Sequence, residues 1–185
     1  MNMPLDIGAG ILIALFVAHV FHVHADAFLI ALGIIFALLP DVDILLDILG
    51  KSKKYYDHRI QTHYPLVWIP VALVVWVIFG PIIATLLSAC VFMHFVHDTI
   101  GLGWGIAWLA PFSYRKIRFL SPTGSKTGGW KFFDTWLPHQ EEEMAAVQHD
   151  PHWVRTYYLR PNTIGFIEYG VFLVGLATLW FVFSN

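Results

Sequence analysis

Acidic and imidazole side chains cluster at the ends of long apolar runs in this chain. They fall in four separate segments: Asp6, Asp41 with Asp43, His58 with His63, and His94 with Asp98. Ionisable groups at such positions are costly in a membrane and are functional candidates by default. Imidazole together with carboxylate suits zinc, manganese or iron better than calcium or magnesium. The chain therefore predicts a site for two or three divalent metal ions, zinc or alternatively manganese, held by these seven residues.

The spacing of the ligands has a chemical logic. His94 and Asp98 are four residues apart, so on a helix they share one face and can bind one metal or two neighbouring metals. Asp41 and Asp43 are two apart and would diverge on a regular helix, so we expect Pro40 to break the helix and let both carboxylates face the bundle. One of the two carboxylates can then bridge two metals. The other can bind a metal directly or hold another ligand in position. The single cysteine, Cys90, lies in an apolar run, which excludes a cysteine-based zinc finger and a disulfide framework.

Arg59 lies between the two histidines of its segment, and a guanidinium beside metal ligands can grip a phosphate oxygen bidentately. Two metals would hold the phosphoryl group and lower the pKa of a bound water. This combination predicts phosphoester hydrolysis, with Arg59, Asp43 and His63 as candidate catalytic residues. A general base is not singled out, because a metal-bound hydroxide can act without one.

The segments that must bring the candidate metal ligands together are apolar. The chain has 185 residues, of which 57% are hydrophobic and 13% charged, against about a quarter charged in a soluble domain. Five apolar runs, separated by short turns such as Gly80-Pro81, cover residues 7–23, 27–39, 65–79, 82–96 and 163–183. A sixth, 100–112, is interrupted by glycines and is expected to be re-entrant or interfacial.

These runs predict an all-α integral-membrane helical bundle with about five transmembrane helices. We expect residues 1–120 to form the membrane bundle that carries the His/Asp cluster, 121–162 a cytoplasmic loop and helix, and 163–185 a C-terminal transmembrane helix.

The basic residues predict the orientation of the bundle. All eleven Lys and Arg residues fall between the second and third runs or between the fourth and fifth, so the positive-inside bias places both loops in the cytoplasm. The N-terminus is then inside, the C-terminus outside, and the polar cluster at the cytoplasmic face of the cell membrane. A site at that depth predicts a membrane lipid or lipid-linked substrate, with no nucleic-acid partner.

Four motifs in this order resemble the membrane-bound metal-dependent hydrolase family of bacteria and archaea. They are Leu-Leu-Pro-Asp-Val-Asp at 38–43, His-Arg-x-x-Thr-His at 58–63, His-x-x-x-Asp at 94–98 and Trp-Leu-Ala-Pro-Phe at 108–112. The resemblance covers about residues 1–120, and that family is similar to zinc-dependent phospholipases C and single-strand nucleases. It implies metal ligation by the aspartates and histidines of the first three motifs, and substrate contact by Arg59. The chain departs from the family at Asp6, Ile44 and Tyr64, where members often carry histidine, histidine and serine.

Other interpretations of the same residues stay open. Asp41 and Asp43 could be ordinary turn residues at a helix end, His58 and His63 could lie in a solvated loop, and Arg59 could simply anchor the loop inside. An alternative function is a metal-binding or metal-transporting membrane protein that uses the same ligands without hydrolysis. The outer-face histidines at 19, 22 and 24 favour transport, whereas the lack of polar residues along the third and fifth runs disfavours it. A structural protein without metal is the third class.

Overall fold

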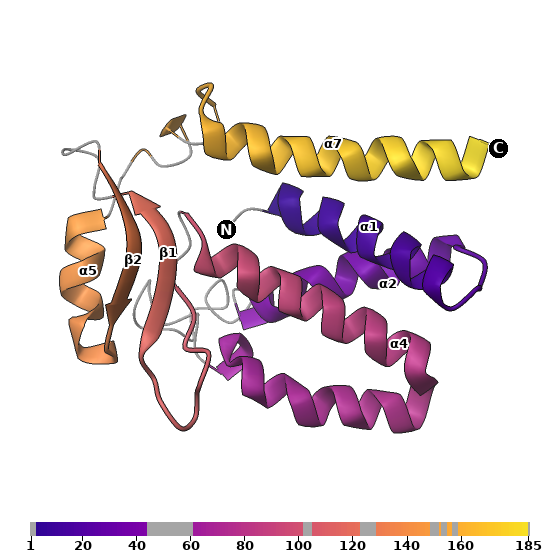
Figure 1. Cartoon of the computed structure of the whole chain (residues 1–185), viewed down its shortest axis with the longest axis horizontal. Helices are drawn as coiled ribbons and strands as arrows, with labels where there is room; N and C mark the ends of the chain where they lie inside the picture. Colours follow the sequence, from indigo (N-terminus) through magenta and orange to yellow (C-terminus); the bar gives the residue numbers. More distant parts are fainter. Residues whose placement is uncertain are drawn as a thin grey trace. The chain divides into compact units, whose positions relative to one another are not determined.

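The computed structural model describes residues 3–43, 61–101, 105–122, 129–148, 152, 155–156 and 159–184 (Figure 1). The predicted site residues His58 and Arg59 lie outside this described part. The chain divides into two compact units. Unit 1 contains Met1–Pro40, Trp68–His94 and Asn162–Asn185, and unit 2 contains Asp41–Val67 and Phe95–Pro161.

Unit 1 is helical. Its elements are α1 (Met3–Val20), α2 (Ala27–Leu38), most of α4 (Trp68–Thr99) and α7 (Thr163–Ser184). Helix α1 lies between α2 and α7 (Figure 1). Its buried side chains, such as Ile11 and Val17, meet Leu29 of α2 and Leu86 of α4 in one apolar cluster. The outward faces of α4 and α7 also expose large apolar side chains, as expected where lipid rather than water surrounds a helix.

Helix α1 packs through glycines. A Cβ at Gly10 would lie 2.5 Å from the carbonyl oxygen of Gly33 on α2, and a Cβ at Gly8 would lie 2.6 Å from the backbone of Phe172 on α7. Small residues that let two backbones approach this closely are typical of helix contacts inside membranes. The glycines of α1 therefore set its distance to both neighbouring helices.

Helix α4 turns back on itself at Gly80 (Figure 1). Gly80 has φ 83° and ψ 178°, a backbone region open essentially to glycine alone, and Pro81 follows it. The predicted turn at Gly80-Pro81 is confirmed.

Within the part of the chain that the structure describes, three helices are long and apolar enough to cross a membrane: α1, the helical stretch Pro65–Thr99 and α7. The prediction of a mostly helical membrane protein is confirmed, whereas the number of five transmembrane helices is not. Helix α2 has only 12 residues.

Unit 2 contains a β-hairpin that the all-α prediction lacked, and that part of the prediction is corrected. Strands β1 (Lys116–Pro122) and β2 (Trp130–Trp136) pair antiparallel and are followed by the 3₁₀ helix η4 (Pro138–Gln140) and α5 (Glu141–Gln148). β-branched and aromatic residues favour strands, and the Gly/Ser/Thr-rich stretch 123–129 between them is typical of a hairpin connection. Part of the sixth apolar run also joins the strands, because Ile106 forms a bridge with Ile117.

Candidate metal centre

Three carboxylates surround one imidazole in unit 2. Nε2 of His63 lies 3.4 Å from Oδ1 of Asp41 and 3.5 Å from Oδ2 of Asp98, while Nδ1 lies 3.3 Å from Oδ2 of Asp43. All four side chains are buried, and His63 is only 1% exposed. We call these four residues the His63 cluster.

The two aspartates reach the same histidine because the chain changes helix type. Helix α2 ends at Leu38, and the 3₁₀ helix η1 (Leu39–Asp43) follows it. Asp41 and Asp43 are both buried, while Val42 between them is exposed. The break predicted at Pro40 is confirmed, and the two carboxylates contact opposite nitrogens of one ring.

Thr62 fixes the Nδ1 side of the ring. Its hydroxyl, in the 3₁₀ helix η2 (Gln61–His63), donates a hydrogen bond of 2.9 Å to Oδ2 of Asp43, and Oγ1 lies 3.2 Å from Nδ1 of His63. Two oxygens that can accept a hydrogen bond therefore face Nδ1, so the tautomer with a proton on Nδ1 satisfies this side of the ring. With Nδ1 protonated, Nε2 can carry the lone pair that a metal needs, on the side where Asp41 and Asp98 lie.

Aromatic side chains close one side of the His63 cluster. The ring of Phe95 lies 6.3 Å from that of His63, and Trp108 packs edge-on against Phe95. The indole of Trp108 donates a 3.0 Å hydrogen bond to Thr99, whose hydroxyl donates to the carbonyl of Phe95. An apolar wall of this kind limits water and lowers the local dielectric around a site.

Tyr64 directly follows His63 in the chain. It packs edge-on against Tyr114, with ring centroids 5.7 Å apart. Burial, and then the neighbouring Tyr114 and Glu141, raise the pKa of Tyr64 above its ordinary value. Its hydroxyl therefore remains a hydrogen-bond donor well above neutral pH.

Unit 1 contains a second buried pair of an imidazole and a carboxylate. Nδ1 of His94, on α4, lies 2.9 Å from the carbonyl oxygen of Ala37 and 3.6 Å from Oδ2 of Asp6. The carbonyl can only accept, so Nδ1 donates the hydrogen bond, and Nε2 is the ring nitrogen left to bind a metal. A backbone carbonyl behind Nδ1 is the usual support of a metal-binding histidine.

A family model described as the YdjM inner membrane protein matches residues 1–185. The chain belongs to the YdjM inner membrane protein family. Comparison with curated proteins and with solved structures found no match. The family and the apolar helices support a location in the cell inner membrane. The resemblance to metal-dependent hydrolases stays a prediction.

The structure of this YdjM-family protein brings together four of the predicted ligands in unit 2, the His63 cluster, and pairs Asp6 with His94 in unit 1. His58 and Arg59 lie outside the described residues. The histidines at 19, 22 and 24 are exposed at the turn between α1 and α2.

Sequence reasoning missed Glu168. This residue lies on α7, in a run that had looked almost uncharged, and is only 2% exposed. The available signal was a single carboxylate inside a 22-residue apolar helix, which marks a functional candidate. Thr62 was part of a quoted motif, but its role was missed, because a threonine in a polar segment gives no sign that it will position an aspartate.

Proposed function

We propose that this YdjM-family protein is a membrane-embedded, metal-dependent hydrolase, a phosphoesterase that acts on a phospholipid or lipid-linked phosphate at the cytoplasmic face. The observation that carries the proposal is the His63 cluster. Three carboxylates from two segments of the chain lie within 3.5 Å of a single imidazole in a buried setting. Burying several like charges together is costly unless cations offset them.

The donor set fits a divalent cation. Oδ1 of Asp41 and Oδ2 of Asp98 each lie within 3.5 Å of Nε2 of His63, and one nitrogen with carboxylate oxygens suits zinc or manganese. The other oxygen of Asp43, Oδ1, is buried and accepts no hydrogen bond from any described residue. Asp43 therefore orients His63 with one oxygen and can offer the other to a second ion.

A bound divalent ion would polarise a phosphoryl oxygen and produce hydroxide near neutral pH. The chain's own residues would fix the geometry: Asp43 and Thr62 hold the ring of His63, and Arg59 neutralises the substrate phosphate. Asp6, His58 and His94 remain proposed ligands, so that two or three ions are bound per chain.

The proposal includes a topology of five membrane segments: α1, α2, the two arms of α4 on either side of Gly80, and α7. The N-terminus lies in the cytoplasm and the C-terminus outside. A periplasm-dependent phosphatase reporter fused after residue 185 should be active, and one fused after Gln148, in the second basic segment, should be inactive. The reverse pattern would contradict this orientation.

Hydrolysis is tested with defined lipids. Detergent-purified protein loaded with zinc or manganese is incubated with phosphatidic acid, phosphatidylglycerol or phosphatidylethanolamine in mixed micelles, and the products are measured by mass spectrometry. We expect cleavage of at least one lipid, and a rate more than about 100-fold lower in Asp98→Ala, because losing even a residue that only orients a ligand costs about 10- to 100-fold.

The matched control is Glu143→Ala, an exposed carboxylate on α5, which should leave the rate unchanged. Metal binding without cleavage of any lipid in the panel would contradict the hydrolase and leave a metal-binding or transporting protein. Equal loss in both variants would contradict the assignment of Asp98.

A further inference from the structure

Several described residues near the end of the hairpin where β1 stops and β2 begins have exposed apolar side chains. These are Phe119, Leu120, Trp130, Phe132 and Phe133, which we call the hairpin patch. Phe132 is 73% exposed. The rings form one group, since Phe119 lies 5.3 Å from Phe133 and 6.2 Å from Phe132 between centroids. An exposed apolar group of this kind marks an interaction surface.

At the opposite end of the hairpin, charged side chains are buried. Lys116, Arg118 and Asp134 are buried there. Arg118 lies 3.4 Å from Asp134 and stacks over the ring of Trp136, and Nζ of Lys116 lies 2.6 Å from Glu141 at the start of α5. A hairpin in water buries apolar side chains and exposes charges. This hairpin buries three charged side chains, Lys116, Arg118 and Asp134, and exposes four aromatic rings, so the patch is suited to an apolar environment.

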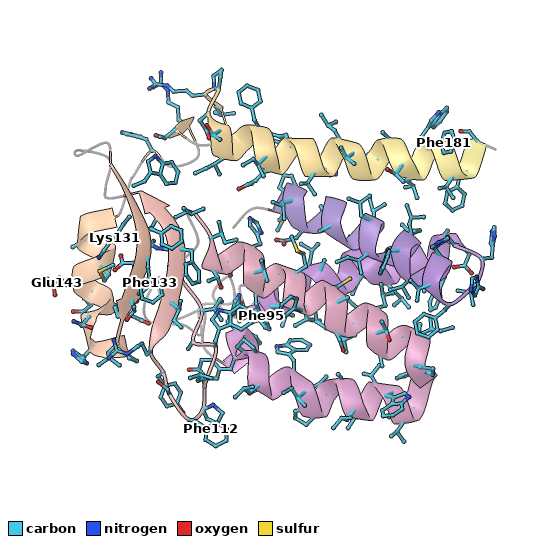
Figure 2. All side chains as sticks on the ribbon, viewed as in Figure 1. Phe95, Phe112, Lys131, Phe133, Glu143 and Phe181 are labelled. Atoms are coloured by element: carbon cyan, nitrogen blue, oxygen red, sulfur yellow. The ribbon has the colours of Figure 1, made fainter. Side chains whose placement is uncertain are left out.

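In the described part of the hairpin, the charged ends of the basic side chains lie away from the patch. Lys131 lies beside the patch residues on β2, but its Nζ reaches back to Oδ1 of Asp134 at 2.8 Å. Figure 2 labels Lys131 and Phe133 on β2, and Glu143 on the side of α5 away from the strands. Arg115, just before β1, is exposed and donates a 2.9 Å hydrogen bond to Thr135. Long basic side chains whose charged ends lie away from apolar surface are typical of residues at a membrane interface.

We propose that the hairpin patch inserts into an anionic phospholipid leaflet, with the exposed Arg115, at the other end of the hairpin, at head-group level. The ring of Trp130 suits the depth where amphipathic rings settle, the phenylalanine rings suit the hydrocarbon, and the exposed Arg115 complements anionic head groups. Because the family is located in the inner membrane, a phospholipid surface is available to the patch. This proposal is independent of whether the His63 cluster hydrolyses lipids.

The test measures the depth of single spin labels in the full-length protein. Labels are attached to Leu120→Cys, Phe132→Cys and, as the matched control, Glu143→Cys, each in a Cys90→Ala background, in nanodiscs of phosphatidylethanolamine and phosphatidylglycerol. Power-saturation EPR then compares collisions with oxygen, which concentrates in lipid, and with a water-soluble nickel chelate. We expect oxygen to dominate at positions 120 and 132, and the nickel chelate at position 143.

Two results would overturn the proposal. Nickel accessibility at positions 120 and 132 equal to that at 143 would place the patch in water. Exclusion of both reagents would instead show a protein contact, with a second copy or another chain. The charge component is tested in nanodiscs of phosphatidylcholine, where the labels should lie shallower; an unchanged depth would contradict the role of Arg115.

Discussion

His63→Ala is expected to lower the affinity of the protein for zinc or manganese by at least about 100-fold, since losing a residue that merely orients a ligand already costs about 10- to 100-fold. The substitution removes the nitrogen that faces Asp41 and Asp98. It also removes the ring that Asp43 and Thr62 hold in place. The affinity is measured by competition with a chromogenic chelator in detergent.

Two further variants serve as a control and a comparison for His63→Ala. His139→Ala changes an exposed histidine of η4 and should leave the affinity unchanged. Asp43→Asn keeps the shape of the side chain but removes its charge, and should weaken binding less than His63→Ala does. Equal affinities of the wild type and His63→Ala would remove His63 from the site.

Gly10→Val is expected to destabilise unit 1 by about 3 kcal/mol, the upper part of the usual range for overpacking a well-packed contact. The first added carbon would lie 2.5 Å from the carbonyl oxygen of Gly33, and backbone cannot move aside as a side chain can. Helices α1 and α2 would have to separate, which opens the apolar cluster around Ile11 and Leu29. The apparent unfolding temperature in detergent measures the effect.

Gly170→Ala is the matched control for that substitution. Gly170 is also helical, on α7, but a Cβ there would meet no atom within 4 Å. Alanine is favoured over glycine inside a helix by about 1 kcal/mol, so this variant should be unchanged or slightly more stable. Equal melting of Gly10→Val and wild type would contradict the glycine-mediated contact.

The members of the His63 cluster could be found from sequence because polar residues at the ends of apolar runs have few structural explanations. Pro40 also signalled the break that brings Asp41 and Asp43 to one ring. The particular contact that each of these residues makes with His63 could not be predicted. Whether an aspartate faces Nδ1 or Nε2 of His63 depends on the 3₁₀ geometry of two short segments and on the hydroxyl of Thr62.

The helices could be predicted, because hydropathy decides where they lie. The hairpin could not be predicted, because it depends on pairing between two separate segments. The apolar runs predicted the helices, and the Gly80-Pro81 break between two runs predicted the turn at Gly80. The hairpin was missed because β1 and β2 depend on each other, and because their exposed aromatic residues break the usual alternation of buried apolar and exposed polar positions. Glu168 was missed because one charge hardly changes the mean hydropathy of α7.

The most direct test of the central claim is the metal content of detergent-purified protein, by inductively coupled plasma mass spectrometry, without added metal or chelator. The wild type and the Asp41→Ala, Asp98→Ala double variant are compared. The proposed metal centre predicts zinc or manganese at one or more equivalents per chain in the wild type, and its loss in the double variant. No bound metal in the wild type, even after reconstitution with zinc and manganese, would contradict both the metal centre and the hydrolase.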